Sequence, residues 1–202
     1  MRRTLAALTL LALAACGGLK STAEQAITMA DAAVAAVAPA AEKVLPDDLA
    51  ALTGAIATAK DAFARGEYQP VIDGLKDIPA EAAALGDKVP GETARLTEEW
   101  NTLTVAMPRN LQAVKAELDR LGKMRRLPQG MDAAKLESAK GAYDAAVAEW
   151  PSITEAWTAG NLAAAMNQAT ALKAKVSEAM QAVGLAADEK AWSNQMSAPM
   201  KP

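Results

Sequence analysis

The sequence predicts an all-α protein, an antiparallel bundle of about six helices. Apolar residues recur at helical spacing along nearly the whole chain, and no segment alternates with a period of two over the length of a strand. Alanine, the residue with the highest helix propensity, supplies much of the 51% hydrophobic content. The connections between helices are short, which favours antiparallel neighbours.

The first two helices are expected on either side of Pro46. The capping box Ser21-x-x-Glu24 predicts that the first one begins at residue 21. Its apolar face contains Ile27, Val34, Val37, Ala41 and Val44. The second helix begins at Pro46 and ends at Gly66. Its apolar residues recur in steps of three and four: Leu49, Leu52, Ile56, Ala59 and Phe63.

The middle of the chain predicts a helix with Pro79 inside it, a loop at Pro90-Gly91, and then one long helix. The shorter helix has the apolar face Val71, Leu75, Ile78, Ala82 and Leu85. The long one has Leu96, Trp100, Leu103, Met107, Leu111, Val114, Leu118 and Leu121. This pattern continues through Pro108 without a change of phase, which favours one kinked helix, although Pro108 could equally begin a new one.

The C-terminal third predicts two further long helices after a loop at 127–130. Asp132 caps the first, where Leu136, Tyr143, Trp150 and Trp157 follow one another every seven residues. Pro151 either kinks or breaks this helix. The second contains Leu162, Met166, Ala169, Leu172, Val176, Met180 and Val183. Gly184 ends it, and Asp188 could cap a short helix containing Trp192 before a frayed tail.

Two segments 94 residues apart resemble each other. Phe63-x-x-Gly66-x-Tyr68 and Trp157-x-x-Gly160-x-Leu162 each place an aromatic residue before a glycine that can end a helix. Both resemble the turn between the paired helices of a tetratricopeptide repeat, although tandem repeats recur at about 34 residues. This is consistent with a two-fold repeat of an αα-hairpin, but any alanine-rich hairpin with a glycine turn would look similar.

The N-terminus has the features of a secretion signal. Arg2 and Arg3 precede about a dozen apolar residues, fewer than the roughly 20 that a membrane-spanning helix needs. A plain signal peptidase would require only the small residues Ala14 and Ala15. Leu13-Ala14-Ala15-Cys16 also resembles the lipobox of bacterial lipoproteins, and Cys16 is the only cysteine.

This resemblance implies that residues 1–15 are removed and that Cys16 carries fatty acyl chains such as palmitate. Residues 16–21 would form a short tether, 22–187 the helical domain, and 188–202 a short helix and frayed tail. Gly17 stands where aspartate would mark retention at the inner membrane. The resemblance therefore implies an outer-membrane lipoprotein facing the periplasm, and the inner membrane stays open because sorting rules differ between bacteria.

The composition argues against several classes of function. Without histidine, the chain has no Ser-His or Cys-His pair and no common zinc ligand set. We therefore predict no enzyme activity, no cofactor and no metal site. The formal net charge is −3, and no basic stripe is interleaved with aromatic residues, so nucleic acid is not an expected partner.

Two candidate contact sites remain. Arg120, Lys123, Arg125 and Arg126 gather near a helix C-terminus, where cations are favoured, and could contact an anionic partner such as a lipid headgroup. Trp192 lies outside the main apolar stripes and, if exposed, could contact a partner protein.

The sequence favours a membrane-anchored, non-enzymatic interaction or structural component of the cell envelope, with an envelope protein as its partner. A helical binding protein for a small or lipidic ligand, held near Pro108 and Pro151, is the alternative. A carboxylate-dependent envelope enzyme is a more remote one.

Overall fold

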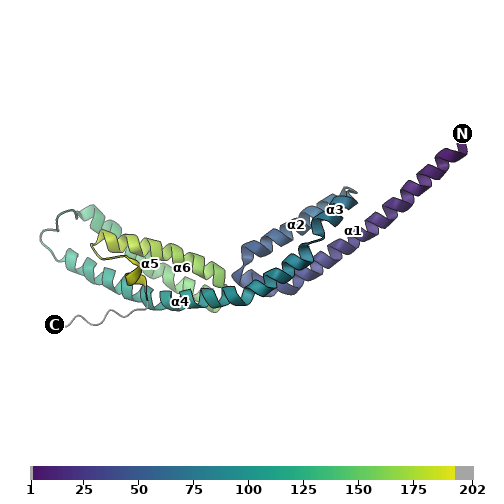
Figure 1. Cartoon of the computed structure of the whole chain (residues 1–202). Helices are drawn as coiled ribbons and strands as arrows, with labels where there is room; N and C mark the ends of the chain where they lie inside the picture. The colour runs from purple at the N-terminus through teal and green to yellow at the C-terminus, as the bar shows by residue number, and fades with distance from the viewer. Residues whose placement is uncertain (1, 194–202) are drawn as a thin grey trace. The chain divides into compact units, whose positions relative to one another are not determined.

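The computed structural model describes the backbone of residues 2–193 and the side chains of residues 18–193, and this part of the chain is helical without strands (Figure 1). The elements in chain order are α1 (Arg2–Val44), α2 (Pro46–Ala64), α3 (Tyr68–Leu75), α4 (Ile78–Gly122), α5 (Ala133–Thr158), α6 (Leu162–Ala182) and the 3-10 helix η1 (Glu189–Trp192). The predicted all-α fold is confirmed. Among the residues with described side chains, no helix has both the length and the hydropathy of a membrane span.

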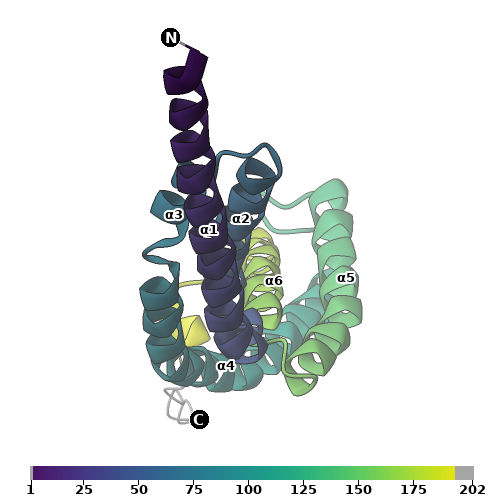
Figure 2. The same cartoon turned by 90° about the vertical axis from the view of Figure 1, so that its right-hand side faces the viewer.

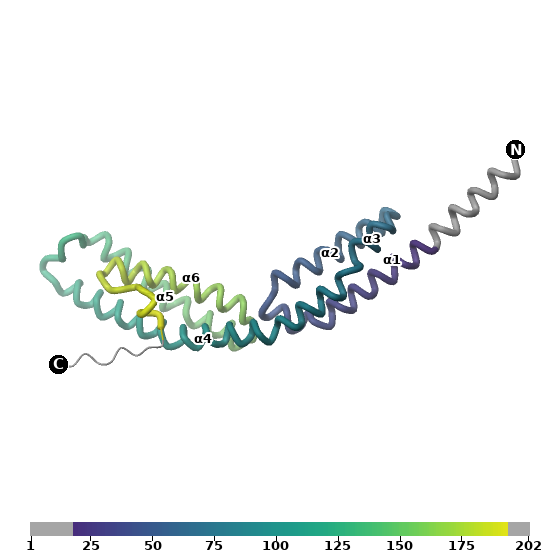
Figure 3. Tube along the Cα trace, viewed as in Figure 1, coloured from purple at the N-terminus to yellow at the C-terminus, as the bar shows by residue number. Residues whose placement is uncertain are grey.

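The chain divides into two compact units, unit 1 (Met1–Glu92) and unit 2 (Thr93–Pro202). Unit 1 contains α1, α2, α3 and the first part of α4, and unit 2 contains the rest of α4 with α5, α6 and η1 (Figure 3). The sequence had indicated no boundary inside residues 22–187. Each unit is therefore built from three successive helical segments, with α3 and the start of α4 together forming the third segment of unit 1.

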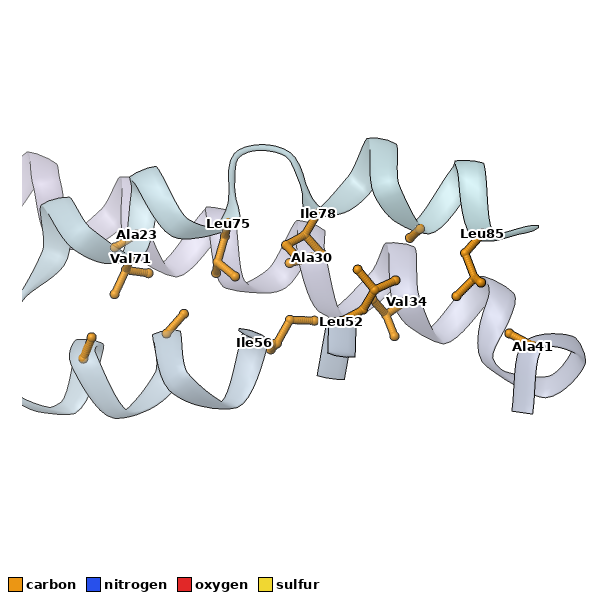
Figure 4. Close-up of a cluster of buried hydrophobic side chains, with 13 residues drawn as sticks. Ala23, Ala30, Val34, Ala41, Leu52, Ile56, Val71, Leu75, Ile78 and Leu85 are labelled. Carbon is orange, nitrogen blue, oxygen red and sulfur yellow. The ribbon is translucent and has the colours of Figure 1, made fainter. Parts of the chain in front are cut away.

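In unit 1, α1, α2 and α3 pack against one another, as Figure 2 also shows. Small residues of α1 allow this close packing, because Ala23, Ala30 and Ala41 are completely buried at the interface (Figure 4). The predicted apolar faces of the other two segments are confirmed. The buried residues that they supply are Leu52, Ile56, Ala59, Ala62, Val71, Leu75, Ile78, Ala82 and Leu85.

Unit 2 has larger side chains in its core. From α4 these are Leu96, Trp100, Leu103, Met107, Leu111 and Val114. From α6 they are Met166, Leu172, Val176 and Met180, with alanines between them. A smaller cluster of Leu121, Ala139 and Val183 lies next to the connection between α4 and α5.

Two of the predicted helix starts and stops are wrong. Ser21 does not begin a helix, because α1 runs from Arg2 to Val44 and includes residues 16–21, which were expected to form a tether. The Leu and Ala residues before it have high helix propensity, and they outweigh the local capping signal. Pro90-Gly91 is not a loop but lies inside α4.

The prolines have different effects. The third helix of unit 1 does not continue through Pro79: α3 ends at Leu75, and α4 begins at Ile78. In a continuous helix, the ring of Pro79 would clash with the carbonyl of Leu75. By contrast, α4 and α5 run unbroken through Pro108 and Pro151. These two rings are exposed, so water can bind the carbonyl groups that lose their N–H partners.

The two segments that resemble each other in sequence form the same turn. Gly66 and Gly160 have φ of 81° and 88°. The next residue in each case donates its N–H to a carbonyl five residues earlier, Glu67 to Ala62 and Asn161 to Ala156, both at 3.0 Å. This is the Schellman motif, which requires a left-handed residue that glycine adopts without strain.

The similarity extends along the helices that follow these turns. Five positions in the third segment of unit 1 are buried, and so are the five positions 94 residues later: Val71 and Ala165, Leu75 and Ala169, Ile78 and Leu172, Ala82 and Val176, Leu85 and Ala179. The expected two-fold repeat of a helical hairpin is therefore confirmed, with an interruption at 76–77 in the first copy only.

Candidate functional site

The predicted basic cluster lies at the connection between α4 and α5. Arg120 is in the last turn of α4, and Lys123, Arg125 and Arg126 belong to the basic loop, defined as residues 123–132. All four side chains are exposed. The structure thus brings the predicted residues together on the surface of unit 2.

The basic loop is held against the protein by its apolar residues. Leu127 and Met131 are partly buried and pack on the cluster of Leu121, Ala139 and Val183. With these two residues turned inward, the loop presents its cations outward.

Hydrogen bonds of the backbone and of two side chains fix the second half of the loop. The N–H of Met131 donates to the carbonyl of Pro128 at 3.1 Å, and Gly130 has a φ of 87°. As predicted, Asp132 caps α5, with its carboxylate accepting a hydrogen bond from the N–H of Lys135 at 2.8 Å. The ammonium of Lys135 donates to the carbonyl of Gly130 at 2.7 Å. These hydrogen bonds hold residues 128–132 in a fixed turn at the start of α5.

Two carboxylates beside the loop already have cationic partners. Arg120 donates to Glu117 through Nε at 2.8 Å, and this hydrogen bond lowers the pKa of Glu117 and raises that of Arg120. Lys115 donates to Asp119 at 2.7 Å, which lowers the pKa of Asp119 in the same way. Both carboxylates therefore stay ionised near neutral pH.

The other three cations differ from Arg120. Within the described side chains, Lys123, Arg125 and Arg126 form no ion pair with a carboxylate. Met124 lies between them in the sequence and is 39% exposed, and its sulfur accepts a hydrogen bond from Arg120 at 3.4 Å. The sequence alone did not distinguish the paired cation from the three unpaired ones, because the pairing depends on side-chain positions.

Trp192, a candidate partner contact if exposed, is buried instead. Its side chain is only 4% exposed, and its Nε1–H donates to the hydroxyl of Ser177 at 3.0 Å. The ammonium of Lys173 lies 5.4 Å from the centre of the indole ring, close enough for a cation–π interaction. Trp192 is therefore part of the packing of unit 2.

Two residues of α4, which the sequence analysis did not single out, hold this C-terminal segment. Asn110 donates to the carbonyl of Ala191 at 2.9 Å, and Arg109 donates to the carbonyls of Ala191 and Ser193. Asn110 is the buried polar residue of the core, at 4% exposure. Its position on the apolar stripe of α4 was the signal that could have revealed this role, because a buried amide needs a hydrogen-bond partner.

Unit 2 also has open grooves on its surface. One groove between α4 and α6 measures about 550 Å³, and another between α4 and α5 measures about 480 Å³. The second is lined by Leu118, Leu136 and Tyr143, with Lys115, Asp119, Glu137, Lys140 and Asp144 also in its wall. Neither Pro108 nor Pro151 lines these grooves, so the grooves do not lie where the ligand-binding hypothesis placed the ligand.

Cys16, the predicted lipidation site, lies outside the residues whose side chains are described. Within residues 18–193, no three His, Cys, Asp or Glu side chains are arranged to hold a metal ion. Comparison of the chain with protein-family models, curated proteins and solved structures found no match.

Proposed function

We propose that this protein is a membrane-anchored lipoprotein that faces the periplasm and acts as a non-enzymatic interaction or structural component of the cell envelope. The observation that carries the proposal is the sequence Leu13-Ala14-Ala15-Cys16, with the only cysteine of the chain directly after an apolar leader. Cys16 would be acylated, and several acyl chains give stable anchoring. Gly17 favours the outer membrane.

The architecture supports a role in binding other proteins. Each of the two units has three helical segments and its own copy of the glycine turn, and apart from Asn110 the buried side chains among the described residues are apolar. The grooves of unit 2 are open and have charged residues in their walls, which suits contact with an extended protein segment. We therefore propose an envelope protein as the partner.

A binding protein for a small or lipidic ligand is a second candidate. The groove between α4 and α5 favours it, because Leu118, Leu136 and Tyr143 give the groove an apolar lining. A carboxylate-dependent enzyme would need a general acid with a raised pKa. Asp119 in this groove has a lowered pKa instead, so it does not suit the role of that general acid.

The anchoring is tested by expressing the full chain in a bacterium and measuring the mass of its N-terminal peptide. We expect a peptide that begins at Cys16 and carries acyl chains, and a protein that partitions into detergent. Cys16→Ser should abolish both results. A wild-type peptide with an unmodified Cys16, or one that retains residues 1–15, would overturn the proposal.

The partner is tested by photo-crosslinking in intact cells. A photoreactive residue at Thr170, in the wall of the groove between α4 and α6, should give a discrete crosslinked product. The same residue at Thr53, exposed on α2 outside the grooves described, is the matched control. Identical products from both positions, or none from Thr170, would contradict binding in this groove.

A further inference from the structure

The basic loop has a combination of charge and exposed apolar surface that the proposed function does not use. We propose that this loop is a second membrane contact, in which Lys123, Arg125, Arg126 and Met124 bind the anionic phospholipid surface of the bilayer. This inference rests on the proposed function only in that the protein must be held at a membrane.

Charge is the first argument. The segment from Arg120 to Arg126 contains four cations in a chain with a net charge of −3. The adjacent carboxylates Glu117 and Asp119 form their ion pairs with Arg120 and Lys115. Of the three loop cations, Lys123 also lies near enough to Asp119 to lower the pKa of its carboxyl group, but none of the three forms an ion pair with either carboxylate. A cation near an anionic bilayer strengthens binding about fivefold, so three cations predict an effect on the order of a hundredfold.

The exposed methionine is the second argument. Met124 is 39% exposed, whereas other apolar residues of the same loop, such as Leu127, are packed inward. A flexible apolar side chain surrounded by cations can enter the headgroup region while the cations bind phosphate groups. Binding to a bilayer would therefore remove this apolar surface from water.

The shape of the site is the third argument. None of the grooves described above has Lys123, Arg125 or Arg126 in its wall. A single phosphate group or an acidic peptide is best recognised in a recess, where several donors converge on it. Cations presented together on an exposed loop suit an extended anionic surface. Because the loop is already fixed by its apolar residues and by Asp132, little conformational entropy is lost on contact.

The test uses the full protein, processed in its host membrane, purified and reconstituted in vesicles. An environment-sensitive fluorophore is attached at Gln129→Cys, a position in the loop that leaves the four proposed contact residues unchanged. We expect its emission to shift to the blue in vesicles of phosphatidylcholine mixed with phosphatidylglycerol, and not in vesicles of phosphatidylcholine alone. High salt should reverse the shift, because it screens the attraction.

Two triple variants separate a specific contact from an effect of net charge. Lys123→Gln, Arg125→Gln and Arg126→Gln together should weaken the contact by about two orders of magnitude and abolish the shift. Lys60→Gln, Lys76→Gln and Lys88→Gln together change the net charge equally, but these lysines have carboxylate partners, so the shift should persist. Circular dichroism confirms that both variants fold.

Equal emission in the two kinds of vesicle, or loss of the shift in both triple variants, would overturn the proposal. So would a shift that appears only on addition of lipopolysaccharide or an acidic protein. Failure of the proposed function is recognised separately, from the mass of the N-terminal peptide, because the loop emission is measured on protein whose acylation state is known.

Discussion

The indole rings of Trp100 and Trp157 lie face to face, with their centres 4.5 Å apart and their planes within 5° of parallel. Trp150 also stacks on Trp100, with the two ring centres 5.5 Å apart. Trp100 comes from α4 and is 7% exposed, whereas the other two come from α5 and are half-buried. This stack joins α4 to α5, and the seven-residue spacing in α5 serves to bring Trp150 and Trp157 to one partner.

Replacing the central residue of this stack should destabilise unit 2. Trp100→Ala removes a buried ring and its two stacking partners, and we expect the free energy of unfolding to fall by about 3–5 kcal/mol. Urea denaturation followed by circular dichroism measures this change. Trp150→Ala, at a half-buried position, is the comparison and should have a smaller effect. Equal losses for the two variants would show that the stack does not centre on Trp100.

The glycine turn of unit 1 offers a matched pair of variants. Gly66→Ala should lower the free energy of unfolding by about 1–2 kcal/mol, because alanine is strained at a φ of 81°. A Cβ atom at Gly66 meets no neighbour within 4 Å, so the effect would come from the backbone alone. Gly54→Ala, equally free of contacts but inside α2, should instead raise this free energy by about 1 kcal/mol. Thermal unfolding of both variants tests whether the free energy of unfolding falls for Gly66→Ala and rises for Gly54→Ala.

Asn110 should control the opening of the C-terminal segment. Asn110→Ala removes one of the hydrogen bonds to the carbonyl of Ala191, with an expected loss of about 1 kcal/mol, because Arg109 still binds this carbonyl. The amide of Ala191 should then exchange with solvent several times faster, as hydrogen exchange by NMR can measure. Asn101→Ala, an exposed position on the same helix, is expected to leave this rate unchanged.

The pair of Glu117 and Arg120 predicts a dependence on pH. The pKa of Glu117 is lowered in the folded protein, so the stabilisation is present above the pKa of an unfolded glutamate, about 4.3, and is lost as pH falls through the lowered value. Carboxyl NMR titration should show Glu117 titrating below the ordinary range. Arg120→Gln should raise the pKa of Glu117 toward its ordinary value, whereas Arg125→Gln should leave this pKa unchanged. The same upward shift in both variants would exclude the specific pair.

Much of the fold was predictable because helix propensity and apolar spacing are local properties. The buried residues of α2 and α6, the caps at Asp132 and Asp188, and the glycine turns at Gly66 and Gly160 follow from a few neighbouring residues each. The start of α1 and the helix through Pro90 were not predictable in this way. In these places the propensity of the flanking residues, or exposure of the proline, outweighed a local stop signal.

For the candidate site, the sequence located the basic residues but did not show which of them form ion pairs with carboxylates. It placed Arg120, Lys123, Arg125 and Arg126 in one short segment, and the structure showed that Arg120 alone has a carboxylate partner among the described residues. Trp192 shows the opposite case. Its position outside the main apolar stripes left its exposure open, and Ser177 and Lys173, which are distant in sequence but close in space, contribute to its burial.

The sequence by itself determined the all-α class, the repeated glycine turn and the apolar leader before Cys16, because each depends on residue types at short spacing. Only the tertiary structure decided the division into two units, the stacking of Trp100 on Trp157, and the burial of Asn110 and Trp192. These depend on contacts between residues as many as 84 positions apart. Such contacts are set by how whole helices pack, and the spacing within any one helix does not specify them.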